Sequence, residues 1–132
     1  MKVISVFGSS SPEPGSADYL LAESVGRLLG EAGFGVQTGG YMGVMEGASK
    51  GANETGAEVI GITCTAIEKF RPKGPNPWIK TELRYETLRE RLLHVITHND
   101  GMLVLPGGIG TLAELAMGWN GIQTGELPPR PL

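Results

Sequence analysis

The stretch from Leu103 to Glu114, which reads LVLPGGIGTLAE, constrains the fold of this chain more than any other. An apolar run typical of a buried strand leads into Pro-Gly-Gly, and the residues after Gly110 have the pattern of a helix. Thr111 is a suitable N-cap, and Glu114 can complete a capping box or face a bound ligand. Unpaired backbone N–H groups at such a turn favour a phosphate, because they carry the positive end of the helix dipole.

The rest of the chain alternates apolar, strand-like runs with segments of helical periodicity. Strands are predicted at 2–7, 35–38, 58–63, 81–86 and 102–105, and helices at 17–32, 44–55, 87–98 and 112–122. Ser16 is the expected N-cap of the first helix, and Gly33 its C′ residue. This alternation predicts one Rossmann-like α/β domain over residues 1–132, a doubly wound parallel sheet in three αβα layers.

Two segments have an unusual composition. Residues 64–80 contain three prolines, so we expect an irregular loop, which in a compact domain is usually functional or mobile. The helix predicted at 44–55 is rich in small residues, which would let it pack closely against the sheet or a ligand. Those small residues are Gly47, Ala48, Ser49, Gly51 and Ala52.

Composition excludes several classes of protein. A length of 132 residues suits a single small domain, and a net charge of −3 disfavours nucleic acid as a partner. No apolar run reaches the roughly 20 residues of a membrane span, and one cysteine cannot form an internal disulfide. We therefore expect a soluble cytoplasmic protein. His94 and His98 lie four residues apart without a third ligand, so they are interpreted as a surface feature, with no metal site predicted.

Three turns rich in Gly or Ser follow predicted strands, at 8–11, 39–43 and 106–110. Because the carboxyl ends of parallel strands meet at one edge of the sheet, where ligands bind in such folds, all three turns should share that edge. None matches G-x-G-x-x-G with a well-placed acidic residue, or the phosphate loop of nucleoside triphosphatases. Tight turns alone would explain one such glycine cluster, whereas three on one edge favour a phosphate ligand.

These motifs resemble the Lonely Guy (LOG) family. Residues 106–114 match its PGGxGTxxE signature, and residues 39–45, GGYMGVM, are similar to its GGxxGLM segment. The similarity continues through residues 6–10 and 58–62, and Arg91 after Glu90 corresponds to the arginine of the family's E-R-K segment. Members long carried the label lysine decarboxylase, but no lysine here lies in a setting that suggests a pyridoxal phosphate Schiff base.

The resemblance implies a Rossmann-like homodimer that binds a nucleoside 5′-monophosphate, with AMP or an N6-modified AMP as the ligand class. It implies hydrolysis of the N-glycosidic bond to a free base and ribose 5-phosphate, without a metal or redox cofactor. Glu114 would be the catalytic carboxylate, and Arg91 would hold it or a phosphate. The phosphate and nucleotide would be bound by Gly107, Gly108, Gly110 and Thr111, with Gly40 and Gly43 on the other wall and Ser9 on the floor. Helices 87–98 and 112–122 would form the dimer interface.

The sequence departs from the family pattern near Arg91 and in the second glycine turn. Leu88, Arg89 and Leu92 replace the usual Met, His and Lys, while Tyr41 and Met42 replace smaller residues. The family also normally continues with a strand and a helix beyond the last residue here. These differences leave open a protein that binds a nucleotide or the molybdenum cofactor without catalysis, as some relatives with this fold do.

Overall fold

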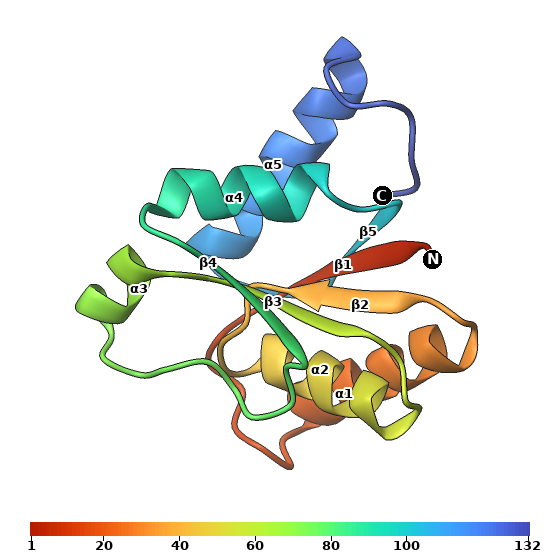
Figure 1. Cartoon of the computed structure of the whole chain (residues 1–132), viewed down its shortest axis with the longest axis vertical. Coiled ribbons are helices and arrows are strands. Elements are labelled where there is room, and N and C mark those ends of the chain that lie inside the picture. Colours follow the sequence, from red (N-terminus) through yellow and green to blue (C-terminus); the bar gives the residue numbers. More distant parts are fainter.

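The computed structural model describes residues 1–132, in which five strands and five helices alternate. The elements in chain order are β1 (Val3–Phe7), α1 (Ala17–Glu31), β2 (Gly35–Thr38), α2 (Val44–Glu54), β3 (Val59–Cys64), α3 (Thr65–Phe70), β4 (Thr81–Tyr85), α4 (Leu88–Thr97), β5 (Gly101–Val104) and α5 (Ile109–Thr124). Helices α1 and α2 cover one face of the sheet, and α4 and α5 cover the other (Figure 1). The predicted three-layer Rossmann-like α/β fold is confirmed.

All neighbouring strands are parallel, in the spatial order β4-β3-β2-β1-β5. Strand β1 lies between β2 and β5, and it aligns Ile4 with Val36 of β2 on one side and with Gly101 of β5 on the other. The chain proceeds outward from β1 to β4 and then returns to place β5 on the opposite side of β1. The strand order therefore reverses between β1 and β5, and a crevice opens beyond their carboxyl ends.

Small residues bring α1 and α2 close together. The predicted caps of α1 are confirmed, since the Ser16 side chain accepts a hydrogen bond from the N–H of Tyr19 and Gly33 has a φ of +90°. The small residues of α2 divide between two neighbours: Gly47 and Gly51 lie against the backbone of α1, and Ala48 and Ala52 belong to the core beneath the sheet. Helix α2 therefore packs closely against both α1 and the sheet.

A second core lies between the sheet and α4. Its buried members are Phe7, Ile62, Val95, Ile96 and Met102. Polar groups in the sheet also secure α4: the Ser5 hydroxyl donates to the carbonyl of Val95 at 2.8 Å, and the Gln37 amide donates to Ser5 at 2.9 Å. Both side chains are buried, so these hydrogen bonds avoid the cost of unsatisfied polar groups in the core.

The structure corrects the prediction of an irregular loop over 64–80. Residues Thr65–Phe70 form the short helix α3, because the first proline of the segment is Pro72 and these six residues include the good helix formers Ala66, Glu68 and Lys69. The remainder up to residue 80 is irregular. This short helix stands at the same end of the sheet as the amino-terminal end of α4 (Figure 1).

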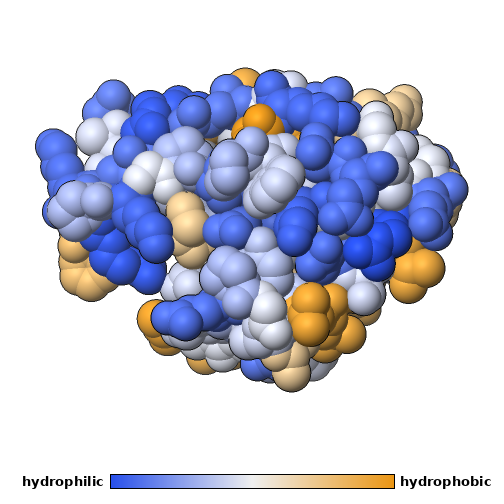
Figure 2. Space-filling model, turned by 90° about the horizontal axis from the view of Figure 1, so that it is seen from below, coloured by the Kyte–Doolittle hydropathy of each residue, from blue (hydrophilic) through white to orange (hydrophobic).

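The two helical layers differ in how many large apolar side chains they expose: three on α1 (Leu20, Leu21 and Leu28) and six on α4 and α5 together. Hydrophilic residues dominate the face formed by α1 and α2, where hydrophobic residues are scattered (Figure 2). In the other layer, large apolar side chains are exposed along α4 and α5, including Leu88, Leu112 and Trp119. None of the helices combines the length and the apolar character that crossing a bilayer requires.

We expect Gly51→Ala to destabilise the protein, although alanine is the better helix former. A Cβ at this position would overlap the carbonyl oxygen of Glu23 on α1, so the two helices would have to separate. Overpacking of this kind outweighs the gain in helix propensity by about 1–2 kcal/mol. Urea unfolding followed by circular dichroism measures the change. Gly110→Ala is the matched control, because nothing lies within 4 Å of a Cβ there, and equal stability of the two variants would contradict the close α1–α2 contact.

Candidate functional site

A cavity of about 680 Å³ lies beyond the carboxyl ends of β1 and β5. Its walls come from the turns after β1 and β2, the starts of α2 and α5, one side of α4, and α3 with the residues that follow it. The cavity occupies the switch point of the sheet, where ligands bind in folds of this type. Six of the residues that the sequence indicated line it: Ser9, Arg91, Gly108, Gly110, Thr111 and Glu114.

The first turn of α5 presents unpaired donors to this cavity. The backbone N–H groups of Gly108, Ile109, Gly110 and Thr111 have no acceptor within the chain, and no side chain caps the helix. The helix is 16 residues long, so its dipole adds positive potential at this end. These donors are exposed along Gly108–Gly110, so the geometry and the dipole favour an anion at this position.

The start of α5 differs from the prediction in one respect. The helix begins at Ile109, with Gly108 as its N-cap, so Thr111 lies within the first turn and is not the cap. The backbone reaches helical geometry earlier because Gly107 and Gly108 form the sharp turn out of β5. A capping box with Glu114 is therefore excluded, and the capping box of the structure is Thr87 with Glu90 at the start of α4.

Gly107 itself lies behind the cavity wall. A Cβ at this position would overlap the Thr111 hydroxyl and approach the backbone nitrogen of Ser9, whose N–H donates to the carbonyl of Pro106 at 3.1 Å. The missing side chain lets the turns after β1 and β5 meet, and it leaves Thr111 buried with only 7 % of its surface exposed. Gly107 supports the site by this close approach.

Glu114 and Arg91 both reach the cavity from the interior, with 9 % and 8 % of their surfaces exposed. Burial raises the pKa of Glu114 to about 7, and the positive charge of Arg91 opposes that rise. Burial also lowers the pKa of Arg91, which Glu114 opposes in turn. An acidic side chain whose pKa lies near neutrality in a cleft is a common mark of a functional site.

Of the two partners expected for Arg91, Glu114 or a phosphate, Glu114 is not in direct contact with it. Arg91 donates from Nε to the carbonyl of Ile62 at 2.7 Å and from Nη2 to that of Gly39 at 2.9 Å, and no ion pair within 4.0 Å joins it to Glu114. Gly39 is required for this arrangement, because a Cβ there would overlap the guanidinium. The remaining nitrogen, Nη1, makes no hydrogen bond within the chain.

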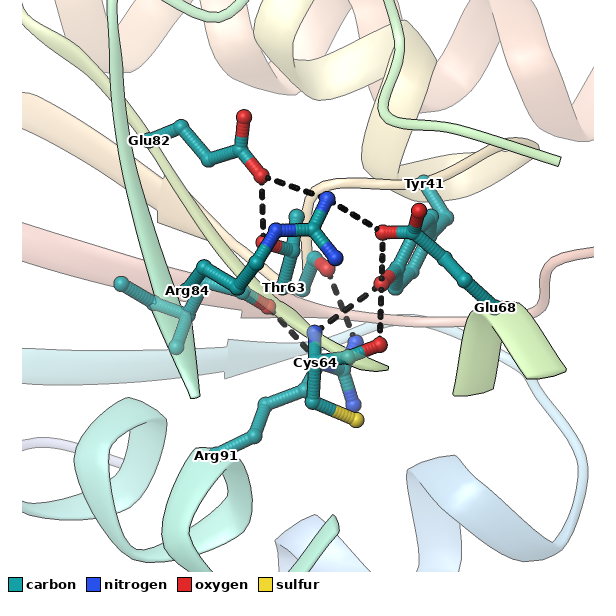
Figure 3. Close-up of polar contacts among 9 residues, drawn as sticks. Tyr41, Thr63, Cys64, Glu68, Glu82, Arg84 and Arg91 are labelled. Atoms are coloured by element: carbon teal, nitrogen blue, oxygen red, sulfur yellow. Dashed lines mark hydrogen bonds and ion pairs between the residues drawn. The ribbon is translucent and has the colours of Figure 1, made fainter. Parts of the chain in front are cut away.

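Tyr41, which stands where the family pattern has a smaller residue, lies at the centre of a polar network (Figure 3). Its hydroxyl lies 2.9 Å from Oε2 of Glu68 and accepts a hydrogen bond from the N–H of Cys64 at 3.0 Å. Burial and the neighbouring Glu68 raise the pKa of Tyr41 to about 12. The guanidinium of Arg91 lies 5.5 Å from the ring centroid, so the ring contributes a cation–π contact to Arg91.

Gly40 and Gly43 lie outside the cavity lining. Both have a positive φ, 86° and 68°, which disfavours any side chain. Gly40 lies against β3, and Gly43 lies against the backbone of the turn after β1, so both shape the turn after β2. Their neighbours Tyr41 and Met42 line the cavity in their place.

Several lining residues were not indicated by the sequence. Leu88 and Leu92, which replace the usual Met and Lys of the family, line the cavity from α4, whereas Arg89 does not. Arg71 and Lys73 line it from the segment after α3. These two cations lie in the proline-rich stretch, where no periodicity or motif predicts which way the chain turns. Their positive charge was the only feature of the sequence that could have indicated a place in the cavity.

We expect the free energy of unfolding to depend on pH because Glu114 titrates differently in the folded and unfolded chain. The pKa is about 7 in the folded chain and 4.5 ordinarily, so between those values the folded chain holds a proton that the unfolded chain releases. The free energy of unfolding therefore falls as pH rises from 4.5 to 7. Between pH 5 and pH 8, the free energy of unfolding of the Glu114→Gln variant should rise by roughly 2–3 kcal/mol relative to that of the parent. Urea unfolding of both proteins measures this, and a difference that is constant with pH would contradict it.

These features define a single-domain Rossmann-like α/β protein with a ligand cavity at the switch point of its sheet. The comparison with known families is consistent with that class. The chain belongs to the SLOG cluster4 family, whose sequence model matches residues 1–124. The resemblance to the LOG family is thereby confirmed.

Named relatives fall into two groups. The chain is 32 % identical over 105 residues to the pyrimidine/purine nucleotide 5′-monophosphate nucleosidase of Escherichia coli K12, and 31 % identical over 122 residues to a probable cytokinin riboside 5′-monophosphate phosphoribohydrolase of Oryza sativa subsp. japonica. These matches cover 74 % and 85 % of this chain but 23 % and 45 % of the relatives. The structure of a molybdenum cofactor binding protein from Rippkaea orientalis is similar with a TM-score of 0.75 and 26 % identity, over 91 % of this chain and 71 % of that one.

Proposed function

We propose that the protein hydrolyses the N-glycosidic bond of a nucleoside 5′-monophosphate, AMP or an N6-modified AMP, to a free base and ribose 5-phosphate. The observation that carries this proposal is the combination, in one cavity, of the unpaired N–H groups at the start of α5 with the buried carboxyl group of Glu114. The names of two relatives, a nucleotide 5′-monophosphate nucleosidase and a phosphoribohydrolase, support the same reaction class.

The phosphate is assigned to the first turn of α5. Gly108, Gly110 and Thr111 offer backbone donors there, and the turn carries no acidic side chain that would repel an anion. Ser9 lies on the adjacent turn, held to Pro106 by a backbone hydrogen bond. A 5′-phosphate at this position leaves the ribose and the base in the remaining part of the cavity, toward Glu114 and α4.

Glu114 is assigned to the chemistry at the anomeric carbon. In the hydrolysis, the bond between C1′ and the base nitrogen breaks, a water oxygen bonds to C1′, and the base leaves with a proton. The ribose gains positive character before water adds, so a carboxylate in a low-dielectric site stabilises it and can orient the water. Glu114 lies in α5 about one helical turn beyond Thr111.

Arg91 is assigned a positioning role beside that carboxyl group. Two of its nitrogens are occupied by backbone carbonyls, which fixes the plane of the guanidinium. Its charge limits the rise in the pKa of Glu114 and so favours the carboxylate near neutral pH. The free Nη1 can donate to a ligand oxygen in the cavity.

We expect incubation with AMP to release adenine, measured by chromatography. Glu114→Gln should lower the rate about 100-fold or more, because it removes charge stabilisation made in the transition state. Glu126→Gln, a change to an exposed glutamate outside the cavity, is the control and should retain the parental rate. Saturable binding of AMP without base release by the parent protein would contradict the proposed reaction.

A second candidate is binding of a nucleotide or of the molybdenum cofactor without catalysis. The similarity to the molybdenum cofactor binding protein of Rippkaea orientalis favours it, and Tyr41 narrows the cavity where the LOG pattern has a smaller residue. The adenine-release assay separates the two candidates, because a carrier binds its ligand and leaves it intact.

We propose a homodimer formed through α4 and α5. Helix α5 is rich in apolar residues, and Ile109, Leu112 and Trp119 are 82 %, 57 % and 62 % exposed. A helix with this composition is typically covered by another apolar surface. A second copy of the chain is the expected partner, because the LOG resemblance implies a homodimer.

Trp119→Lys should therefore shift the protein from dimer toward monomer, because a charge at the centre of an apolar interface is costly to bury. Sedimentation velocity at micromolar concentration measures the assembly state. Leu28→Lys is the matched control, since Leu28 is 65 % exposed on α1 in the opposite layer. A parent protein that sediments as a monomer would contradict the dimer.

A further inference from the structure

The segment that follows α3 brings a guanidinium to the mouth of the cavity. Arg71 Nη1 donates to the hydroxyl of Ser10 at 2.9 Å, and both residues line the cavity. Ser10 neighbours Ser9, whose backbone is bonded to Pro106 at the start of the glycine turn. Arg71 therefore extends from the opposite wall toward the glycine turn, where the unpaired N–H groups of α5 begin.

The glycine turn supplies no positive side chain of its own. Residues 106–111 contain no Lys or Arg, and Arg91, the other arginine of the lining, is buried with Nε and Nη2 bonded to carbonyls. Arg71 is exposed and forms no salt bridge, since the ion pairs of the protein involve Arg27, Lys50 and Arg84. Its neutral partner Ser10 is a weaker acceptor than a phosphate oxygen would be.

The segment that carries Arg71 is anchored on both sides. Before it, Glu68 of α3 bonds to the Tyr41 hydroxyl and forms a 2.7 Å ion pair with Arg84 (Figure 3). After it, the buried Asn76 donates from its side chain to the carbonyl of Tyr41 at 2.8 Å. Both anchors are thus bonded to the same tyrosine. Between these anchors residues 69–74 are exposed, and Phe70, Arg71 and Lys73 line the cavity.

We propose that Arg71 is a phosphate-binding residue, which exchanges its hydrogen bond with Ser10 for the phosphate monoester of the ligand and holds that group against the start of α5. The inference rests on the phosphate position in the proposed function, but not on hydrolysis. It applies equally to any phosphate monoester, whether a nucleoside monophosphate or a phosphorylated cofactor. Tyr41 contributes indirectly, because it fixes the two ends of the segment.

The test measures binding of ribose 5-phosphate by isothermal titration calorimetry, because this compound carries the phosphate and has no base to lose. Arg71→Ala should weaken binding at least about tenfold, and Arg71→Lys less, because lysine keeps the charge but loses the bidentate geometry. Binding of adenosine, which lacks the phosphate, should change little. Lys69→Ala is the matched control, an exposed cation of α3 outside the cavity lining, and should bind both ligands as the parent does.

Each alternative outcome has a defined meaning. Equal binding of ribose 5-phosphate by the Arg71→Ala and Lys69→Ala variants overturns the inference, even if the parent hydrolyses AMP. A parallel loss of adenosine binding in Arg71→Ala also overturns it, because the substitution would then disturb the cavity as a whole. The same holds if the parent fails to bind ribose 5-phosphate. A selective loss of ribose 5-phosphate binding supports the inference, and if the parent releases no adenine from AMP, only the proposed hydrolysis fails.

Discussion

The buried guanidinium of Arg91 joins the elements on which the cavity depends. It extends from α4 and donates to the carbonyls of Ile62 in β3 and Gly39 after β2, so one side chain ties a helix to the carboxyl ends of two strands. A buried cation is tolerable only when its donors are satisfied and a countercharge is near. Here two carbonyls accept from Nε and Nη2, and Glu114 supplies the charge. The hydrogen bonds that hold α4 to the sheet and the positive charge that limits the rise in the pKa of Glu114 therefore come from the same side chain.

Around this cation, the cavity is built from turns that glycine allows to approach one another. Gly39 leaves room for the guanidinium, Gly43 lets the turn after β2 lie against the turn after β1, and Gly107 lets that turn meet the start of α5. The parallel topology places all three turns at one edge of the sheet. Glycine here provides close backbone contacts, while the donors and charges that face a ligand come from neighbouring residues.

Much of the fold follows from local pattern, and the exceptions have local causes. The strands and the four long helices were predictable because apolar periodicity and end signals such as Ser16 and Gly33 are written in short stretches. The start of α5 was placed too late, because a threonine before a helical run is a common cap and the glycine that does the capping gives no side-chain signal. Helix α3 was missed because six residues are too few for a periodicity to be recognised.

The sequence by itself determined the class of fold, the glycine turn before α5 and the family, since each depends on residues adjacent in the chain. Tertiary structure decided which side chains share the cavity. It separated Arg91 from a direct ion pair with Glu114, made Tyr41 the anchor of α3, and brought Arg71 to Ser10, 61 positions away in sequence. Such contacts depend on the path of the irregular segment after α3 and on competition among hydrogen-bond acceptors. Neither is expressed in any local pattern of residues.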